Sequence, residues 1–220
     1  MIFEHKKIDF TELDTETING KRHYVTPKGS YPSITTVLSV LSEKAIAAWR
    51  ARVGEVEANR ISTQAARRGT NVHQMCEDYV NNELEMTKFL PHEKAMFKSV
   101  KSVLDESIGL VYAQECPLYS DYLGIAGRVD CVAEFNGRLS IIDYKTASKL
   151  KKREYIGNYF QQAAAYCVMF EERTKIPVDQ IVIVIAVENE PKPQVFVEKR
   201  DNYIGECINT IAKYKASVEV

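Results

Sequence analysis

The chain has 220 residues, and its 29 Lys and Arg residues nearly balance its 30 Asp and Glu residues, for a formal net charge of −1. Hydrophobic residues make up 45% and charged residues 27%, which is typical of a globular protein and excludes a disordered chain, a collagen and a coiled-coil rod. The near-zero charge also excludes a histone-like polycation, so any contact with nucleic acid needs a local basic patch.

Cysteine usage and the N-terminus indicate where the protein works. The cysteines are odd in number and no pair has CxxC spacing, which disfavours a zinc ribbon or an iron–sulfur cluster. We expect them to be small buried hydrophobes in a reducing compartment. No apolar run approaches roughly 18 residues, and MIFEHKKIDF has neither a signal core nor a transit pattern. We therefore expect a cytoplasmic protein without a membrane segment. The cysteines are Cys76, Cys116, Cys131, Cys167 and Cys207.

The first half of the chain, residues 1–108, reads as mainly helical after a short start of β-type sequence. Ser33 is the expected N-cap of a short helix over ITTVLSVL. The spacing of apolar residues predicts further helices over 44–61 and 63–82, and another from Pro91 to Glu106. Pro91 suits the first position of that helix because its missing N–H needs no partner there.

The pattern changes at Gly109. Three segments then read as strands, namely LVYAQECPLY, IAGRVDCVAEF and RLSIIDYKT. Asn136-Gly137 lies between the last two and is a strong hairpin signal. Four more elements follow: a helix over 154–173, a buried-type strand DQIVIVIAVE, its antiparallel neighbour PQVFVEK, and a helix over 201–215. This order predicts an α/β fold, a central mixed sheet flanked by helices, in a single domain over 1–220 whose sheet-bearing part is 109–220.

A two-residue turn at Asn136-Gly137 places Asp130 directly opposite Asp143, with Lys145 on the same face. Opposed residues have Cβ atoms about 4.5–5.5 Å apart, and two carboxylates there destabilise a sheet. Unpaired charges among apolar neighbours cost several kcal/mol, so a bound Mg²⁺ or Mn²⁺ is expected. The alternative is an ion-pair cluster on an exposed sheet edge, with Arg128 as a further member.

Four motifs, in this order along the chain, resemble the PD-(D/E)XK nuclease superfamily. The first is similar to the helix motif of its RecB-like exonuclease branch. They are Gly69-Thr70-Asn71-Val72-His73, Gly127-Arg128-Val129-Asp130, Asp143-Tyr144-Lys145, and Gln162 with Tyr166. Other stretches are similar to the mitochondrial genome maintenance exonuclease group, namely Pro32-Ser33-Ile34-Thr35-Thr36-Val37-Leu38, Trp49 with Arg50 and Arg52, and Val129-Asp130-Cys131-Val132-Ala133. A bacterial or phage relative of that group is expected. Asp143 stands where many superfamily members carry Glu.

The resemblance implies a central mixed sheet of the superfamily type and a set of site residues. The implied catalytic residues are Asp130, Asp143, Lys145, Gln162 and Tyr166. The implied metal ligands are His73, Asp130, Asp143 and the backbone carbonyl of Tyr144, with Glu115 as an additional candidate. A histidine nitrogen would favour tolerance of Mn²⁺. The alternatives are a structural histidine at 73, a helix–sheet interface for Gln162 and Tyr166, and an exposed strand glutamate at 115.

The resemblance also implies a DNA substrate. Candidate phosphate contacts are Arg68, Lys149, Lys151, Lys152, Ser33 and Thr35, although a basic run is usually a solvated face and Ser33 is already explained as a cap. The implied activity is a Mg²⁺- or Mn²⁺-dependent exonuclease on single-stranded DNA ends, in replication, recombination or repair, with no nucleotide cofactor and no iron–sulfur cluster. Rival functions are a structure-selective endonuclease and a non-catalytic DNA-binding module. The intact Asp130, Asp143 and Lys145 argue against the latter.

Overall fold

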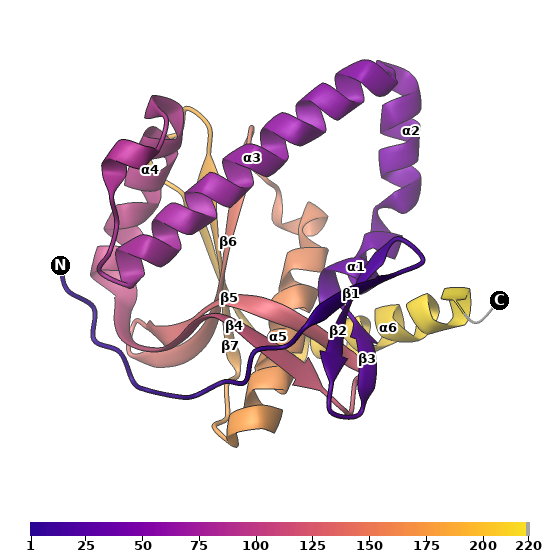
Figure 1. Ribbon diagram of the computed structural model, residues 1–220. Helices are drawn as coiled ribbons and strands as arrows, with labels where there is room; N and C mark the ends of the chain where they lie inside the picture. Colours follow the sequence, from indigo (N-terminus) through magenta and orange to yellow (C-terminus); the bar gives the residue numbers. More distant parts are fainter. Residues whose placement is uncertain (219–220) are drawn as a thin grey trace.

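The computed structural model describes residues 1–218, so the last two residues of the expected 1–220 domain lie outside the described part. A five-stranded mixed sheet forms its centre (Figure 1), with the strands in the order β4-β5-β6-β7-β8. All neighbours are antiparallel except β6 and β7, which run parallel. The strands are β4 (Ile108–Ser120), β5 (Ile125–Phe135), β6 (Arg138–Ala147), β7 (Gln180–Val187) and β8 (Gln194–Lys199).

Helices cover both faces of this sheet (Figure 1). The parallel pair β6–β7 needs a crossover, which α5 (Gly157–Thr174) supplies. α5 packs on one face together with α1 (Ile34–Leu38) and α6 (Ile204–Val218), while α3 (Glu55–Val80) and α4 (Pro91–Ser107) pack on the other. Because strand side chains alternate, each strand feeds two cores: Ile141 faces α5 and Ile142 faces α3.

The N-terminal part adds a small antiparallel sheet of β1 (Thr15–Ile18), β2 (Lys21–Thr26) and β3 (Gly29–Pro32). A single bridge between Ser33 and Ala126 joins the segment after β3 to β5. α2 (Glu43–Val53) has no buried residue and leads into the long α3 (Figure 1). Short 3-10 turns complete the chain at Ser39–Leu41, Met86–Lys88, Arg153–Tyr155 and Arg200–Asn202.

The predicted α/β architecture with a central mixed sheet is confirmed, and so is the Ser33 cap, whose Oγ accepts from the Thr36 N–H at 3.1 Å. The predicted boundary between helices 44–61 and 63–82 is wrong. The break lies at Gly54, whose φ of 85° is one that glycine adopts without strain, and α3 then runs unbroken. The helix predicted from 154 also begins later, at Gly157, after a 3-10 turn.

The five cysteines are all buried and none is in a disulfide, as expected for small hydrophobes. Among residues 1–218, no helix combines the length and the apolar character that crossing a membrane requires.

Candidate active site

The β5–β6 hairpin positions the first two carboxylates. Its turn residues Asn136 and Gly137 have φ values of 52° and 76°, as a two-residue hairpin turn requires. The paired register runs from Phe135–Arg138 to Cys131–Ile142 and ends one residue short of the predicted Asp130–Asp143 pair. The Tyr144 backbone N–H, adjacent to the carbonyl expected to bind metal, donates to Asp130 Oδ2 at 2.8 Å and fixes that carboxylate.

A local bend in β4 and β5 brings a third carboxylate to the hairpin. Glu115 has a φ of 42°, which is uncommon for a strand residue with a side chain. It lies between the pairs Gln114–Cys131 and Cys116–Val129, beside Asp130. Val129 packs in the core under α5, but Cys131, two residues later, packs in the core under α3. The regular alternation of side chains between the two faces of β5 is therefore interrupted at Asp130. The bend lets Glu115 and Asp130 meet a side chain from α3.

That side chain is His73. One ligand atom each from His73, Glu115 and Asp130 lies within 4.8 Å of the others. His73 Nδ1 is 3.3 Å from Asp130 Oδ2, and the imidazole packs edge-on against the Tyr144 ring with centroids 6.2 Å apart. Burial, aided by the negative charges of Asp130 and Glu77, raises the pKa of Glu115 to about 8. The two carboxylates repel each other, and a bound cation would relieve that repulsion. Two carboxylates and one imidazole are ligands that suit Mg²⁺ or Mn²⁺.

Asp143 and Lys145 form an ion pair on the α5 face. Asp143 is 1% exposed, and Lys145 Nζ lies 2.5 Å from its Oδ2. Burial raises the pKa of Asp143, and the charge of Asp130 adds to this while Lys145 opposes it. Burial alone would lower the pKa of Lys145, but Asp143 and Asp130 outweigh it, so the pKa is raised and the amine stays protonated.

Asp143 also has acceptor capacity to spare. Within residues 1–218, neither of its oxygens accepts a hydrogen bond of good geometry. Among residues 1–218, the side chains whose ligand atoms gather within 4.8 Å are therefore His73, Glu115 and Asp130, rather than the Asp130–Asp143 pair alone that the hairpin suggested. Asp143 turns to Lys145, the cation on its own strand, and remains available as a further oxygen ligand.

α5 places its two predicted residues behind the carboxylates. Gln162 and Tyr166 are both buried on this helix, and Asp130 and Asp143 both add to the burial that raises the pKa of Tyr166. A Cβ on Gly127 would lie 2.8 Å from the Tyr166 ring, so glycine is what leaves room for the phenol. The neighbouring amide on α5, Gln161, accepts instead from Thr210 on α6 at 2.9 Å.

The predicted phosphate contacts differ in their surroundings. Lys149, Lys151 and Lys152 are exposed after β6, whereas Arg68 is 14% exposed and held by Glu188 at 2.5 Å. Ser33 is buried and its hydroxyl caps α1, which leaves Thr35 as the more accessible hydroxyl of the two. Lys21 and Arg22, which no sequence motif singles out, line an open depression together with Ser33, Thr35 and Thr36. Arg22 Nη2 lies 3.4 Å from Thr35 Oγ1.

Two curated proteins resemble this chain. Mitochondrial genome maintenance exonuclease 1 of Mus musculus is 28% identical over 133 residues, which is 56% of this chain and 39% of that protein. Mitochondrial genome maintenance exonuclease 1 of Xenopus tropicalis is 30% identical over 173 residues, which is 73% of this chain and 48% of that protein. The chain thus spans less than half the length of these relatives.

A solved structure of the protein SSO0001 covers 76% of this chain and 70% of its own, with a TM-score of 0.41 and 13% sequence identity. The profile of the PD-(D/E)XK nuclease superfamily matches residues 45–215. That match contains α3, the β5–β6 hairpin and α5, the elements that carry the site. This chain belongs to the PD-(D/E)XK nuclease superfamily.

Proposed function

We propose that this protein is a Mg²⁺- or Mn²⁺-dependent exonuclease that hydrolyses phosphodiester bonds from single-stranded DNA ends, in DNA replication, recombination or repair. The observation that carries the proposal is the cluster of His73, Glu115 and Asp130 beside the buried Asp143–Lys145 pair. The dependence on an end is supported by the two relatives, which are named exonucleases. It remains a proposal because the chain spans less than half of either.

In this proposal His73, Glu115, Asp130 and Asp143 hold the cation, and the backbone carbonyl of Tyr144 is a further candidate ligand. A divalent ion held by these residues would polarise the phosphodiester and lower the pKa of a water molecule. Oxygen ligands from three strands and a nitrogen from α3 suit either Mg²⁺ or Mn²⁺.

Lys145 supplies a fixed positive charge for the transition state. Its side chain is 19% exposed, and its Nζ lies 2.5 Å from Asp143 Oδ2, which holds it in place. A preorganised cation in a poorly solvated site stabilises the charge that develops on the phosphate oxygens. Tyr166 remains a neutral O–H donor because its pKa is raised, and with Gln162 it can orient the water or the phosphate. Lys149, Lys151, Lys152 and Thr35 would contact the DNA backbone farther from the cleaved bond.

The test compares linear and closed circular single-stranded DNA of one sequence, with Mg²⁺, with Mn²⁺ and with EDTA. We expect the linear strand to be degraded in either metal, and both the circle and the EDTA reaction to stay intact. Rapid cutting of the circle would replace the exonuclease by an endonuclease with the same active site. Binding without cleavage in either metal would indicate a DNA-binding module.

A further inference from the structure

The cluster of His73, Glu115 and Asp130, here called the ligand cluster, depends on the unusual backbone of Glu115. The φ of this residue, 42°, lies in the left-handed region. The described pairings of β4 with β5 include its neighbours Gln114 and Cys116 but not Glu115 itself. A residue with a side chain keeps such a conformation only where surrounding groups hold it there. Whatever holds this backbone therefore also sets the position of the Glu115 carboxylate.

Arg128 of β5 makes a direct contact to that backbone. Its Nη1 donates to the carbonyl oxygen of Glu115, from a strand position two residues before Asp130. Its other terminal nitrogen, Nη2, lies 2.5 Å from Oε2 of Glu12, which precedes β1. A guanidinium presents its donors in a rigid, planar fork, so two acceptors together fix its orientation. The Glu115 carbonyl is thus held by a side chain that is itself held.

The N-terminal segment that carries Glu12 is packed on the protein. The Lys6 N–H donates to the carbonyl oxygen of Val111 on β4 at 2.7 Å. Further along, the Phe10 ring packs against Phe170 of α5, with centroids 6.1 Å apart. Glu12 itself is 73% exposed, so we expect its ion pair to contribute less than the contact between Arg128 and the Glu115 carbonyl.

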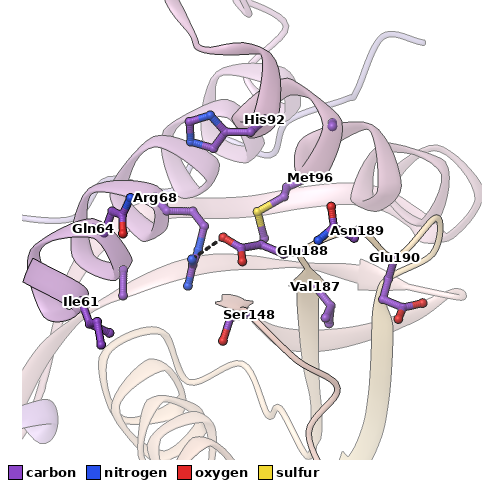
Figure 2. A pocket seen from close by; sticks show the side chains of 12 residues that line it. Ile61, Gln64, Arg68, His92, Met96, Ser148, Val187, Glu188, Asn189 and Glu190 are labelled. Carbon is purple, nitrogen blue, oxygen red and sulfur yellow. Dashed lines mark hydrogen bonds and ion pairs between the residues drawn. The ribbon is translucent and has the colours of Figure 1, made fainter. Parts of the chain in front are cut away.

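Arg68 of α3, another partly buried arginine, is bound differently. Figure 2 shows it beside a cavity of about 620 Å³, with its Nη1 2.5 Å from the carboxylate of Glu188. Glu188 follows β7 and is not a member of the ligand cluster described within residues 1–218. The Arg68 pair ties α3 to the end of β7, whereas Arg128 acts on a candidate metal ligand.

The charge of Arg128 and its contact to Glu115 have opposite effects on a bound cation. A positive side chain next to a cation site repels the ion, so the charge alone would weaken metal binding. The contact strengthens binding, because it keeps a carboxylate directed at the ion. Groups that hold metal ligands in place typically account for about 10- to 100-fold in metal affinity. The sign of the change on removing Arg128 therefore separates the two effects.

We propose that Arg128 is a positioning residue of the metal site. It holds Glu115 in the left-handed conformation that brings the carboxylate to His73 and Asp130, and Glu12 fixes the orientation of its guanidinium. This inference rests on the proposed metal-dependent function. It adds to that function a residue that acts on the ion through Glu115 and against its own charge.

The test measures Mn²⁺ affinity in the absence of DNA, by electron paramagnetic resonance of free Mn²⁺ during a titration. Arg128→Leu should raise the Kd by about 10- to 100-fold, whereas loss of a positive charge alone would lower it. The matched control is Arg138→Leu, which removes an exposed arginine of the same hairpin that pairs with Asp179, and it should leave the Kd unchanged. If Arg128→Leu does not fold, Arg128→Gln, also uncharged but polar, takes its place with the same expectation.

A double-mutant cycle shows whether the effect passes through Glu115. In Glu115→Ala the positioned carboxylate is gone, so adding Arg128→Leu should change the Kd by less than about 2-fold. An effect as large in that background as in the wild type would overturn the proposed route.

The reference for the site is Asp130→Asn, which should weaken Mn²⁺ binding. An unchanged or lowered Kd for the Arg128 variant, together with weak binding by Asp130→Asn, would overturn the positioning role and leave the metal site in place. Equal Mn²⁺ binding by the wild type and Asp130→Asn would overturn both proposals.

Discussion

Replacing Lys145 by methionine should destabilise the protein in a way that depends on pH. The change removes the counter-ion of Asp143, whose carboxylate is 1% exposed and has no hydrogen-bond partner among residues 1–218. Breaking a buried ion pair by removing one partner costs about 3–5 kcal/mol. We expect about 3 kcal/mol at pH 8, the lower end, because the Lys145 side chain is 19% exposed and water already screens part of the attraction. For a chain of this size the loss corresponds to a Tm lower by about 6–12 °C.

The sign of the pH effect follows from Asp143. Burial raises its folded pKa above the unfolded value, and loss of Lys145 raises it further. A carboxyl of this kind binds more protons folded than unfolded, so stability falls as pH rises through that interval and levels off above the folded pKa. The penalty of Lys145→Met should therefore be small at pH 5 and full at pH 8.

Thermal melts of the metal-free protein at both pH values measure the effect, with Lys149→Met, an exposed lysine, as the matched control. The double variant Asp143→Asn Lys145→Met should recover most of the loss, because neutralising both partners removes the unpaired charge. Equal penalties at pH 5 and pH 8, or no recovery in the double variant, would refute the buried-pair reasoning.

Three further predictions concern the site and the DNA contacts. His73→Ala should raise the Mn²⁺ concentration needed for half-maximal cleavage, with Tm changed by only a few degrees; an unfolded variant whose remaining soluble fraction cleaves normally would make the histidine structural. Lys149→Ala should reduce the slope of log affinity for single-stranded DNA against log salt by about 0.7, measured by anisotropy, and an unchanged slope would exclude a phosphate contact. Gly127→Ala should cost about 1–3 kcal/mol in a denaturant melt because the new methyl group overlaps the Tyr166 ring, and neutral stability would contradict that packing.

The hairpin could be predicted because its information is local. Asn136-Gly137 selects a two-residue turn, and that turn leaves one register, the one observed from Phe135–Arg138 to Cys131–Ile142. Helix geometry alone likewise puts Gln162 and Tyr166 on one face of α5, because they are four residues apart. Placing Lys145 on the same face as Asp143 needed only the alternation of side chains along β6.

The rest of the site depends on long-range pairing. Glu115 reaches Asp130 only because β4 bends at a left-handed φ, a conformation that strand alternation does not foresee. The Arg68–Glu188 pair joins residues 120 positions apart, and no local pattern links them. By contrast, the helix break at Gly54 had a local signal, a glycine followed by acidic residues of a new first turn, which outweighs the apolar spacing across it.

The most direct test of the proposed metal-dependent catalysis measures nucleotide release from linear single-stranded DNA against Mn²⁺ concentration, for the wild type and Asp130→Asn side by side. Asparagine keeps an acceptor for the Tyr144 N–H, so the fold around β5 should persist. We predict no release by the wild type in EDTA, saturable release as Mn²⁺ is added, and no release by Asp130→Asn at any concentration although its Tm is maintained. Release by the wild type in EDTA, or undiminished release by Asp130→Asn, would contradict catalysis by a metal held at Asp130.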